Sequence, residues 1–227
     1  MFILFLADKV SPNPGQDTAE VVREESLVEH EVEAPLEKPR SLARRRQVLE
    51  AAGHCFRRYG FHACSMAQIA ADAGMSVGHI YRYFPGKEAI IAAIVREDID
   101  EAMGKFEELR ANPGDLREIL ILRADEGVAR ASEPEQAKLM LEISAESARN
   151  PAIREIVQEK DAKISEQIRH MISKAVGRDL EEADLNARVE MFQLIFQGIS
   201  LRTAVNSQMN GAAMSRLVTL MIDAILL

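Results

Sequence analysis

From Ser41 to the C-terminus, apolar residues recur at helical spacing almost without interruption. In the first such segment, Val48, Ala52, Cys55 and Phe56 occupy positions i, i+4, i+7 and i+8, which form one face of a helix. Ala, Leu, Ile, Glu and Arg dominate the composition, and runs of Val, Thr and aromatic residues, which are typical of strands, are absent from the sequence. The sequence therefore predicts an all-α fold.

Turn-forming residues divide this helical region into segments. Glycine, proline and asparagine interrupt the period at several points, among them Gly74, Pro85-Gly86 and Asn210-Gly211. The chain has 227 residues, which is enough for one large domain or two smaller ones. We expect about nine helices, near residues 41–59, 66–73, 77–83, 86–110, 115–131, 134–149, 151–176, 181–208 and 211–226.

Charge is distributed unevenly, although the formal net charge is −8. Residues 1–39 hold nine acidic residues against three basic ones, and their composition predicts a disordered acidic tail. Residues 40–96 hold nine Lys or Arg against three acidic residues. One basic block in an acidic protein is expected where a single module faces a polyanion, with chance clustering on a solvated surface as the alternative.

Residues 65–84 have the pattern of a helix-turn-helix. Ser65 is a good N-cap, and Gln68 stands at the capping-box position three residues later. Gly74 can adopt a positive φ and end the first helix sharply, and Ser76 can cap the second helix. This order of caps and turn predicts two short helices joined at a tight corner.

The second helix of this motif has an unusual outer face. Ile80 and Phe84 turn its inner face toward the core. Such a helix can read base edges in the major groove of DNA, whereas a helical hairpin without a ligand is the alternative. The outer positions carry hydrogen-bonding or aromatic groups for which packing gives little reason, at Gly78, His79, Tyr81, Arg82 and Tyr83.

Residues 41–95 closely resemble the TetR family of bacterial repressors. The matching residues include Arg46-x-x-x-Leu49-x-Ala51-Ala52, Phe56-x-x-x-Gly60-Phe61, Ser65-Met66-x-x-Ile69-Ala70 and the run from Ala73 to Glu88. The resemblance covers about a quarter of the chain. It implies a three-helix DNA-binding domain at residues 40–88, a helical ligand-binding and dimerisation domain at 89–227, and a homodimer on double-stranded DNA with a palindromic operator.

The resemblance also assigns roles by position. Ser65, Tyr83 and Lys87 would hold phosphates, while Gly78, His79 and Arg82 would lie at or near base edges. Val77 and His79 depart from the common family pattern, so base specificity does not carry over. The candidate DNA-binding residues are Arg44, Ser65, Gln68, Ser76, Val77, Gly78, His79, Tyr81, Arg82, Tyr83 and Lys87.

The last two expected helices carry broad apolar faces on either side of Asn210-Gly211. Pairing this hairpin with its copy in a second chain gives a four-helix bundle, whereas burial of either face within one chain is the alternative. A dimer also places two reading helices on half-sites about 34 Å apart. The candidate dimer-interface residues are Leu185, Val189, Ile195, Ile199, Met214, Leu217, Val218, Met221 and Ile222.

By the same resemblance, a small-molecule effector would bind among the middle helices and alter the spacing of the reading helices. Glu142 and Glu146 lie one helical turn apart and would favour a cationic effector if either lined the pocket; His170 is a further polar candidate. For each apolar candidate, an ordinary core position is the alternative. The candidate pocket residues are Phe106, Leu122, Met140, Glu142, Ile143, Glu146, Met171, Phe192 and Phe196.

Four residues of metal-ligating type, His54, Cys55, His62 and Cys64, lie close together in the sequence but lack the spacing of a zinc site. We therefore expect buried structural thiols and no metal or other cofactor. Two cysteines fit a reducing compartment, and no stretch approaches the ~18 apolar residues of a membrane span, which predicts a cytoplasmic protein. No phosphate loop, carboxylate pair or catalytic triad points to an enzyme.

Two functional hypotheses stay open. The first is a repressor that a small-molecule effector releases from its operator. The second is a regulator that responds to oxidation, through Cys64 beside the basic helix, or to a partner protein.

Overall fold

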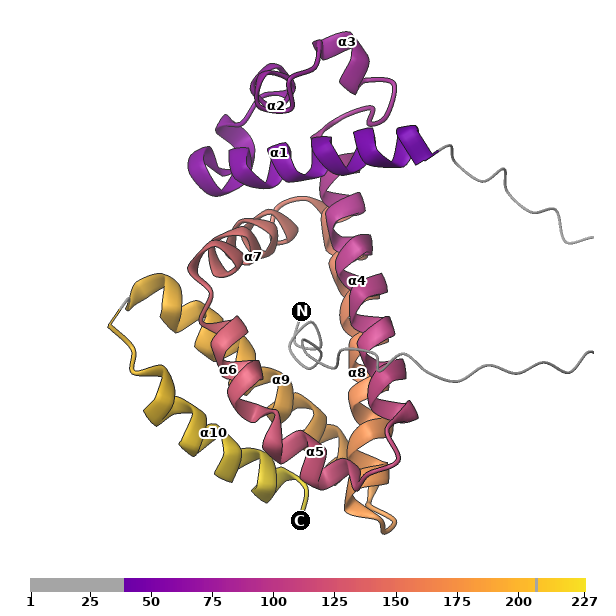
Figure 1. Cartoon of the computed structure of the whole chain (residues 1–227), viewed down its shortest axis with the longest axis vertical. Helices are drawn as coiled ribbons and strands as arrows, with labels where there is room; N and C mark the ends of the chain where they lie inside the picture. Colours follow the sequence, from indigo (N-terminus) through magenta and orange to yellow (C-terminus); the bar gives the residue numbers. More distant parts are fainter. Residues whose placement is uncertain (1–38, 207) are drawn as a thin grey trace, which may run out of the picture.

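The computed structural model describes residues 39–206 and 208–227, and within these ranges the chain folds into ten α-helices (Figure 1). The described residues contain no strand, so the all-α prediction is confirmed. The acidic tail predicted at 1–39 lies, apart from Pro39, outside the described residues. The helices are α1 (Pro39–Ala63), α2 (Met66–Asp72), α3 (Val77–Ile80), α4 (Lys87–Ala111), α5 (Leu116–Leu122), α6 (Ala124–Ala131), α7 (Pro134–Ser147), α8 (Pro151–Val176), α9 (Glu182–Val205) and α10 (Gly211–Ile225).

The helix boundaries differ from the expected ones at three places. The expected helix 115–131 is two helices, because the backbone leaves the helical conformation at Arg123, where the sequence has neither glycine nor proline to signal a break. The third helix ends at Ile80, and the residues after it form turns. The first helix bends at Gly60, whose φ of 76° lies in the left-handed region that favours glycine.

The helices form two regions that lie one above the other along the longest axis of the molecule (Figure 1). Helices α1, α2 and α3 lie at one end, and α4 leads away from them alongside α8. Helix α7 packs against α1 on one side and against α8 and α9 on the other, so it stands between the two regions. Helices α5, α6, α9 and α10 make up the far end. None of the helices in the described ranges is both long enough and apolar enough to cross a membrane.

Two hydrophobic cores correspond to these two regions. The first core surrounds Phe56, Ile69 and Phe84 in the helix-turn-helix region, and it also takes in Leu139 and Ile143 of α7. The second core fills the space among α4, α5, α6, α8, α9 and α10. Helix α4 contributes its N-terminal half to the first core and its C-terminal half to the second. A displacement of α4 therefore repacks both cores, since protein interiors are close-packed.

The apolar faces of α9 and α10 are arranged differently from the predicted dimer interface. Val189, Ile195, Ile199, Val218 and Ile222 are buried in the second core of their own chain, so their placement at a dimer interface was wrong. Two further candidates are partly buried against this core, namely Leu185 and Met214, whereas Leu217 and Met221 are exposed. The same two helices expose other large apolar side chains that the prediction missed: Met191, Leu194, Leu201, Val205 and Leu220.

Candidate nucleic-acid interface and ligand pocket

The helix-turn-helix is built by the local interactions that its sequence predicts. The Ser65 hydroxyl accepts from the backbone N–H of Gln68 at 3.2 Å, and the side-chain Oε1 of Gln68 accepts from the backbone N–H of Ser65 at 2.8 Å, which completes a capping box. Gly74 has a φ of 60° at the corner. The Ser76 hydroxyl caps α3 by accepting from the N–H of His79 at 3.2 Å. Each short helix therefore begins at a satisfied N-terminus.

Helix α3 is seated on the first core by its apolar side. Ile80 and Phe84 are almost fully buried. The guanidinium of Arg45 lies 4.7 Å from the centre of the Phe84 ring and donates a hydrogen bond of 3.4 Å to the carbonyl of Tyr83. Arg45 of α1 thus contacts the end of residues 77–84, here called the recognition segment, and the opposite side of α3 faces outward.

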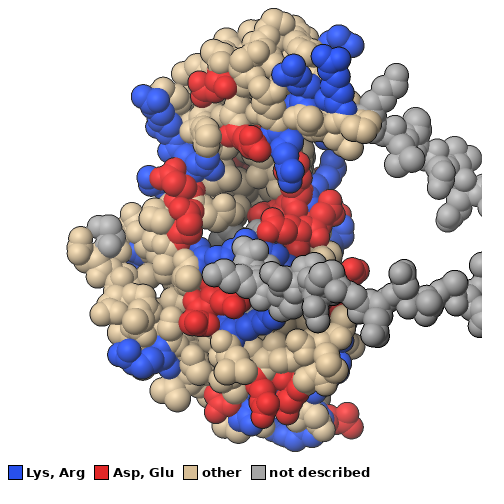
Figure 2. Space-filling view, in the orientation of Figure 1, with Lys and Arg blue, Asp and Glu red and all other residues tan. Residues whose placement is uncertain are grey.

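A cationic groove of about 550 Å³ runs between the start of α1 and the recognition segment. Figure 2 shows Lys and Arg side chains gathered over the end of the molecule where α1 begins. The candidates from the sequence include Arg44, His79, Arg82 and Tyr83 of this groove but miss Arg40, Ser41 and Arg45 at the start of α1. The groove is lined by Arg40, Ser41, Arg44, Arg45, His79, Arg82 and Tyr83.

Most of the candidate DNA-binding side chains on this surface are accessible. Val77, Gly78, Tyr81 and Arg82 are exposed, as are Ser65 and Ser76, whereas Arg44, Gln68, His79 and Tyr83 are half-buried. The ring of His79 lies 5.4 Å from that of Tyr83, one helical turn away, and their polar atoms Nε2 and Oη are 3.4 Å apart. This contact orients the His79 side chain of α3 and the Tyr83 side chain of the turn that follows it.

Lys87 lies elsewhere than the resemblance implied. Its ammonium donates to the carbonyls of Phe61 at 2.5 Å and His62 at 3.3 Å, and it stands 4.4 Å from the centre of the Phe61 ring. These carbonyls are available because α1 bends at Gly60 just before them. In this structure Lys87 therefore joins α4 to the end of α1.

The two cysteines are paired, which corrects the expectation of thiols. Cys55 of α1 and Cys64, the residue before the N-cap of α2, form a disulfide with their Cα atoms 5.8 Å apart. Both residues are fully buried, so Cys64 is not the accessible thiol of a loop. Among the described residues no group of His, Cys, Asp or Glu is arranged to hold a metal.

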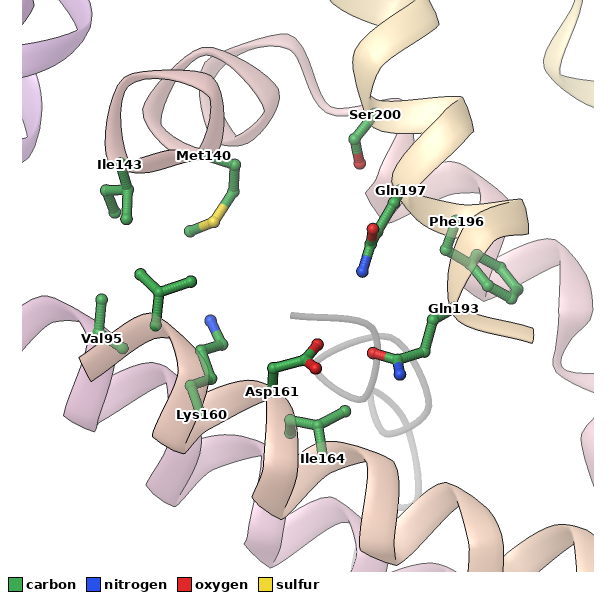
Figure 3. Close-up of a pocket in the computed structure, with 11 residues that line it drawn as sticks. Val95, Met140, Ile143, Lys160, Asp161, Ile164, Gln193, Phe196, Gln197 and Ser200 are labelled. Carbon is green, nitrogen blue, oxygen red and sulfur yellow. The ribbon is translucent and has the colours of Figure 1, made fainter. Parts of the chain in front are cut away.

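A second cavity, of about 130 Å³, lies among α4, α7, α8 and α9 (Figure 3). Of the candidate effector residues, Met140, Ile143 and Phe196 line it. Phe192 is buried in the second core instead of lining the cavity. Leu122 is 76% exposed, so the placement of Leu122 in a pocket was wrong. The full lining is Val95, Met140, Ile143, Val157, Lys160, Asp161, Ile164, Gln193, Phe196, Gln197 and Ser200.

The remaining candidates for the effector pocket lie outside this cavity. Phe106, His170 and Met171 line a separate hollow of only about 10 Å³. Glu142 and Glu146 point instead toward the bend of α1. The carboxylate of Glu142 accepts from the N–H of Phe61 at 3.2 Å, and the buried carboxylate of Glu146 lies 3.0 Å from Nε2 of His62. Their expected role in the pocket is therefore wrong, and their actual role is to join α7 to α1.

Comparison with known proteins identifies this architecture. Residues 48–94 match the family model described as bacterial regulatory proteins, tetR family, and residues 125–227 match the model described as BetI-type transcriptional repressor, C-terminal. The chain is 30% identical over 143 residues to the HTH-type transcriptional regulator UidR of Escherichia coli, which covers 63% of this chain and 71% of that protein. The chain belongs to the TetR family. It is a transcriptional regulator with a DNA-binding domain, as the sequence predicted, and its relatives are regulators rather than enzymes.

Solved structures of TetR-family size and shape agree with this assignment. Salmonella enterica GusR superposes with a TM-score of 0.67 at 28% identity, over 85% of this chain and 99% of that one. FadR of Bacillus subtilis, solved in complex with stearoyl-CoA, superposes with a TM-score of 0.67 at 20% identity, over 78% of this chain and 96% of that one. The second similarity supports the fold alone.

Proposed function

We propose that this TetR-family protein is a homodimeric repressor that binds a palindromic operator through residues 40–88 and is released when a small-molecule effector binds within residues 89–227. The observation that carries the DNA-binding part is the cationic groove beside the outer face of α3. Arginines at the start of α1 suit phosphates, and Arg82, exposed on the recognition segment, suits a base edge. We place the protein in the cytoplasm, where it meets the DNA.

Operator binding tests this proposal through two kinds of variant. Fragments selected from the source genome supply the operator, and fluorescence anisotropy measures affinity over a range of salt concentrations. Arg44→Ala should weaken binding to all sequences alike and lower the slope of log K against log salt by about one, because one phosphate contact is lost. Arg82→Ala should instead change the preferred base at one or two positions, by about 1–3 kcal/mol.

A matched control uses an arginine at the C-terminal end of α4, the end that lies away from the helix-turn-helix. Arg110 is exposed and far along the chain from the recognition segment, so Arg110→Ala should leave affinity, salt slope and base preference unchanged. If Arg82→Ala binds every operator variant as the parent does, the placement of α3 in the groove is wrong. If the parent protein ignores duplex DNA at low ionic strength, the DNA-binding proposal fails as a whole.

The contacts of α7 support effector-driven release. One side of this helix brings Met140 and Ile143 to the cavity. The other side brings Glu142 and Glu146 to the bend of α1, which leads directly into α2. A ligand that displaces α7 therefore acts on the seating of the helix-turn-helix without touching DNA.

Homodimer formation is supported by the exposed apolar side chains on α9 and α10. Leu194 is 55% exposed, and Leu217 and Leu220 of α10 are 58% and 65% exposed. Monomeric proteins rarely leave such large apolar groups together on adjoining elements, so a second copy is the proposed cover. A dimer is also what a palindromic operator requires, because each copy supplies one reading helix.

A further inference from the structure

We infer that the cavity among α4, α7, α8 and α9 binds an amphipathic organic cation: a primary ammonium group on an apolar body of roughly ten non-hydrogen atoms. This inference rests on the proposed function, in which the same cavity is the effector site. The polar residues that define this class, Asp161 above all, are not among the pocket candidates of the sequence analysis.

The cavity has an apolar wall and a polar wall. Val95 of α4 and Met140 and Ile143 of α7 line one side with apolar groups alone, and α8 and α9 add Val157, Ile164 and Phe196. The polar groups all come from α8 and α9, and Figure 3 shows the side chains of Asp161, Gln197 and Ser200 pointing into the space between the walls. A ligand that satisfies both walls carries its polar group at one end and hydrocarbon at the other.

The charges of the polar wall leave one carboxylate unmatched. Lys160 is buried, and its ammonium lies 2.5 Å from a carboxylate oxygen of Asp98, so these two charges neutralise each other. Asp161, the next residue, has no hydrogen bond or ion pair with any residue in the described part of the chain. Asp98 does not line the cavity, so Asp161 is the one carboxylate in its lining; with Lys160 neutralised by Asp98, Asp161 repels an anionic ligand and attracts a cation.

The uncharged polar groups also favour a donor-rich ligand. The amide nitrogen of Gln193 donates to the Ser165 hydroxyl at 2.9 Å, so the amide oxygen is left to accept, and Figure 3 shows it turned toward Asp161. Ser200 is only 7% exposed, yet its hydroxyl has no partner among residues 39–206 and 208–227. A primary ammonium has three N–H donors and no acceptor, which fits Asp161 and the Gln193 oxygen that faces it. The Ser200 hydroxyl lies about two helical turns from Gln193 along α9, so it would contact another part of the ligand.

The size and lining of the cavity narrow the class further. One water molecule occupies about 10–15 Å³ of cavity volume. A cavity of about 130 Å³ therefore holds about ten atoms of that size, which corresponds to a ligand of roughly ten non-hydrogen atoms. Phe196 is the one aromatic residue in its lining. A quaternary ammonium is usually held by several aromatic faces, whereas a primary ammonium is held by hydrogen bonds, and this lining supplies the latter.

Three ligands with the same ten-carbon skeleton test the inference on the full chain. These are 4-phenylbutylamine, 4-phenylbutan-1-ol and 4-phenylbutyrate, which at neutral pH are cationic, uncharged and anionic. Isothermal titration calorimetry should give the amine an affinity at least about tenfold above those of the alcohol and the carboxylate. Asp161→Asn should reduce this preference to about threefold or less. Asp179→Asn, at an exposed aspartate outside the cavity, should leave the preference intact.

The inference is overturned if the alcohol or the carboxylate binds as well as the amine, if Asp161→Asn keeps the preference, or if the amine fails to bind at about millimolar concentration. Anisotropy of the operator complex is a separate readout. An amine that binds selectively through Asp161 but leaves the operator complex intact supports the ligand class and contradicts effector release. If the parent protein binds the amine selectively but does not bind the operator at all, only the DNA-binding proposal is contradicted.

Discussion

Reduction of the Cys55–Cys64 disulfide should lower the stability of the protein by about 3 kcal/mol. The two cysteines are separated by nine positions in the chain. Closing a loop of that length removes about 9 cal/mol/K of entropy from the unfolded chain, which corresponds to about 3 kcal/mol at 25 °C. In a protein of this size 1 kcal/mol shifts the melting temperature by about 2–4 °C, so reduction should lower it by about 6–12 °C.

Differential scanning calorimetry with and without a dithiol reductant measures this shift. Because both cysteines are fully buried, they should be alkylated only after unfolding, and the mass gained then counts the free thiols in each sample. The double variant Cys55→Ala/Cys64→Ala is the control, since its melting temperature should not respond to reductant. A complete reduction that shifts melting by less than about 1 °C would refute the loop-closure argument, and free thiols before reduction would refute the pairing.

The same samples distinguish the two functional hypotheses. The disulfide closes a loop that contains Phe61 and His62, the residues that meet Glu142, Glu146 and Lys87. If operator affinity differs between oxidised and reduced protein but not in the double cysteine variant, the regulator responds to oxidation. If affinity is equal in both forms, the disulfide is structural and the oxidation hypothesis fails.

Two further predictions concern packing and assembly. Gly127→Ala should destabilise the protein by about 1–2 kcal/mol, because the new methyl group would stand 2.7 Å from the buried Phe196 ring. Gly104→Ala, in open space on α4, should stabilise it by about 0.5–1 kcal/mol. Urea unfolding compares the two variants, and equal effects would contradict the close packing of Gly127 against Phe196. The double variant Leu194→Glu/Leu220→Glu should convert the proposed dimer to a monomer, as measured by light scattering. Val189→Ala, on the buried face of α9, should instead lower the stability of the fold and leave the dimer intact. A double Glu variant that stays dimeric places the interface elsewhere.

The helix-turn-helix could be predicted from the sequence because its determinants are local. Ser65 and Gln68 are three residues apart, and the capping box that they form needs no distant partner. Gly74 adopts the positive φ that its place in the motif requires. The family pattern then extended these local signals to the fold, which the comparisons confirm.

The cavity could not be predicted, because its polar groups are assembled from distant parts of the chain. Lys160 is paired with Asp98, 62 positions earlier, and Gln193 is held by Ser165, 28 positions earlier. Nothing in the local sequence separates Asp161, which faces the cavity, from a solvated helix position. Glu142 and Glu146 have the same spacing that a pocket-facing pair would have, but their helix turns that side toward α1.

The two-sided apolar character of α9 explains why the dimer interface was assigned to the wrong face. Val189 and Ile195 face the core of their own chain, while Met191 and Leu194, only one or two positions away, are 45% and 55% exposed. A helix that is apolar on all sides has no single stripe from which periodicity can choose an inward face. Such a helix is expected to be covered on both sides. One side of α9 is buried in the second core of its own chain. We propose that a second copy of the chain packs against Met191 and Leu194 on the other side.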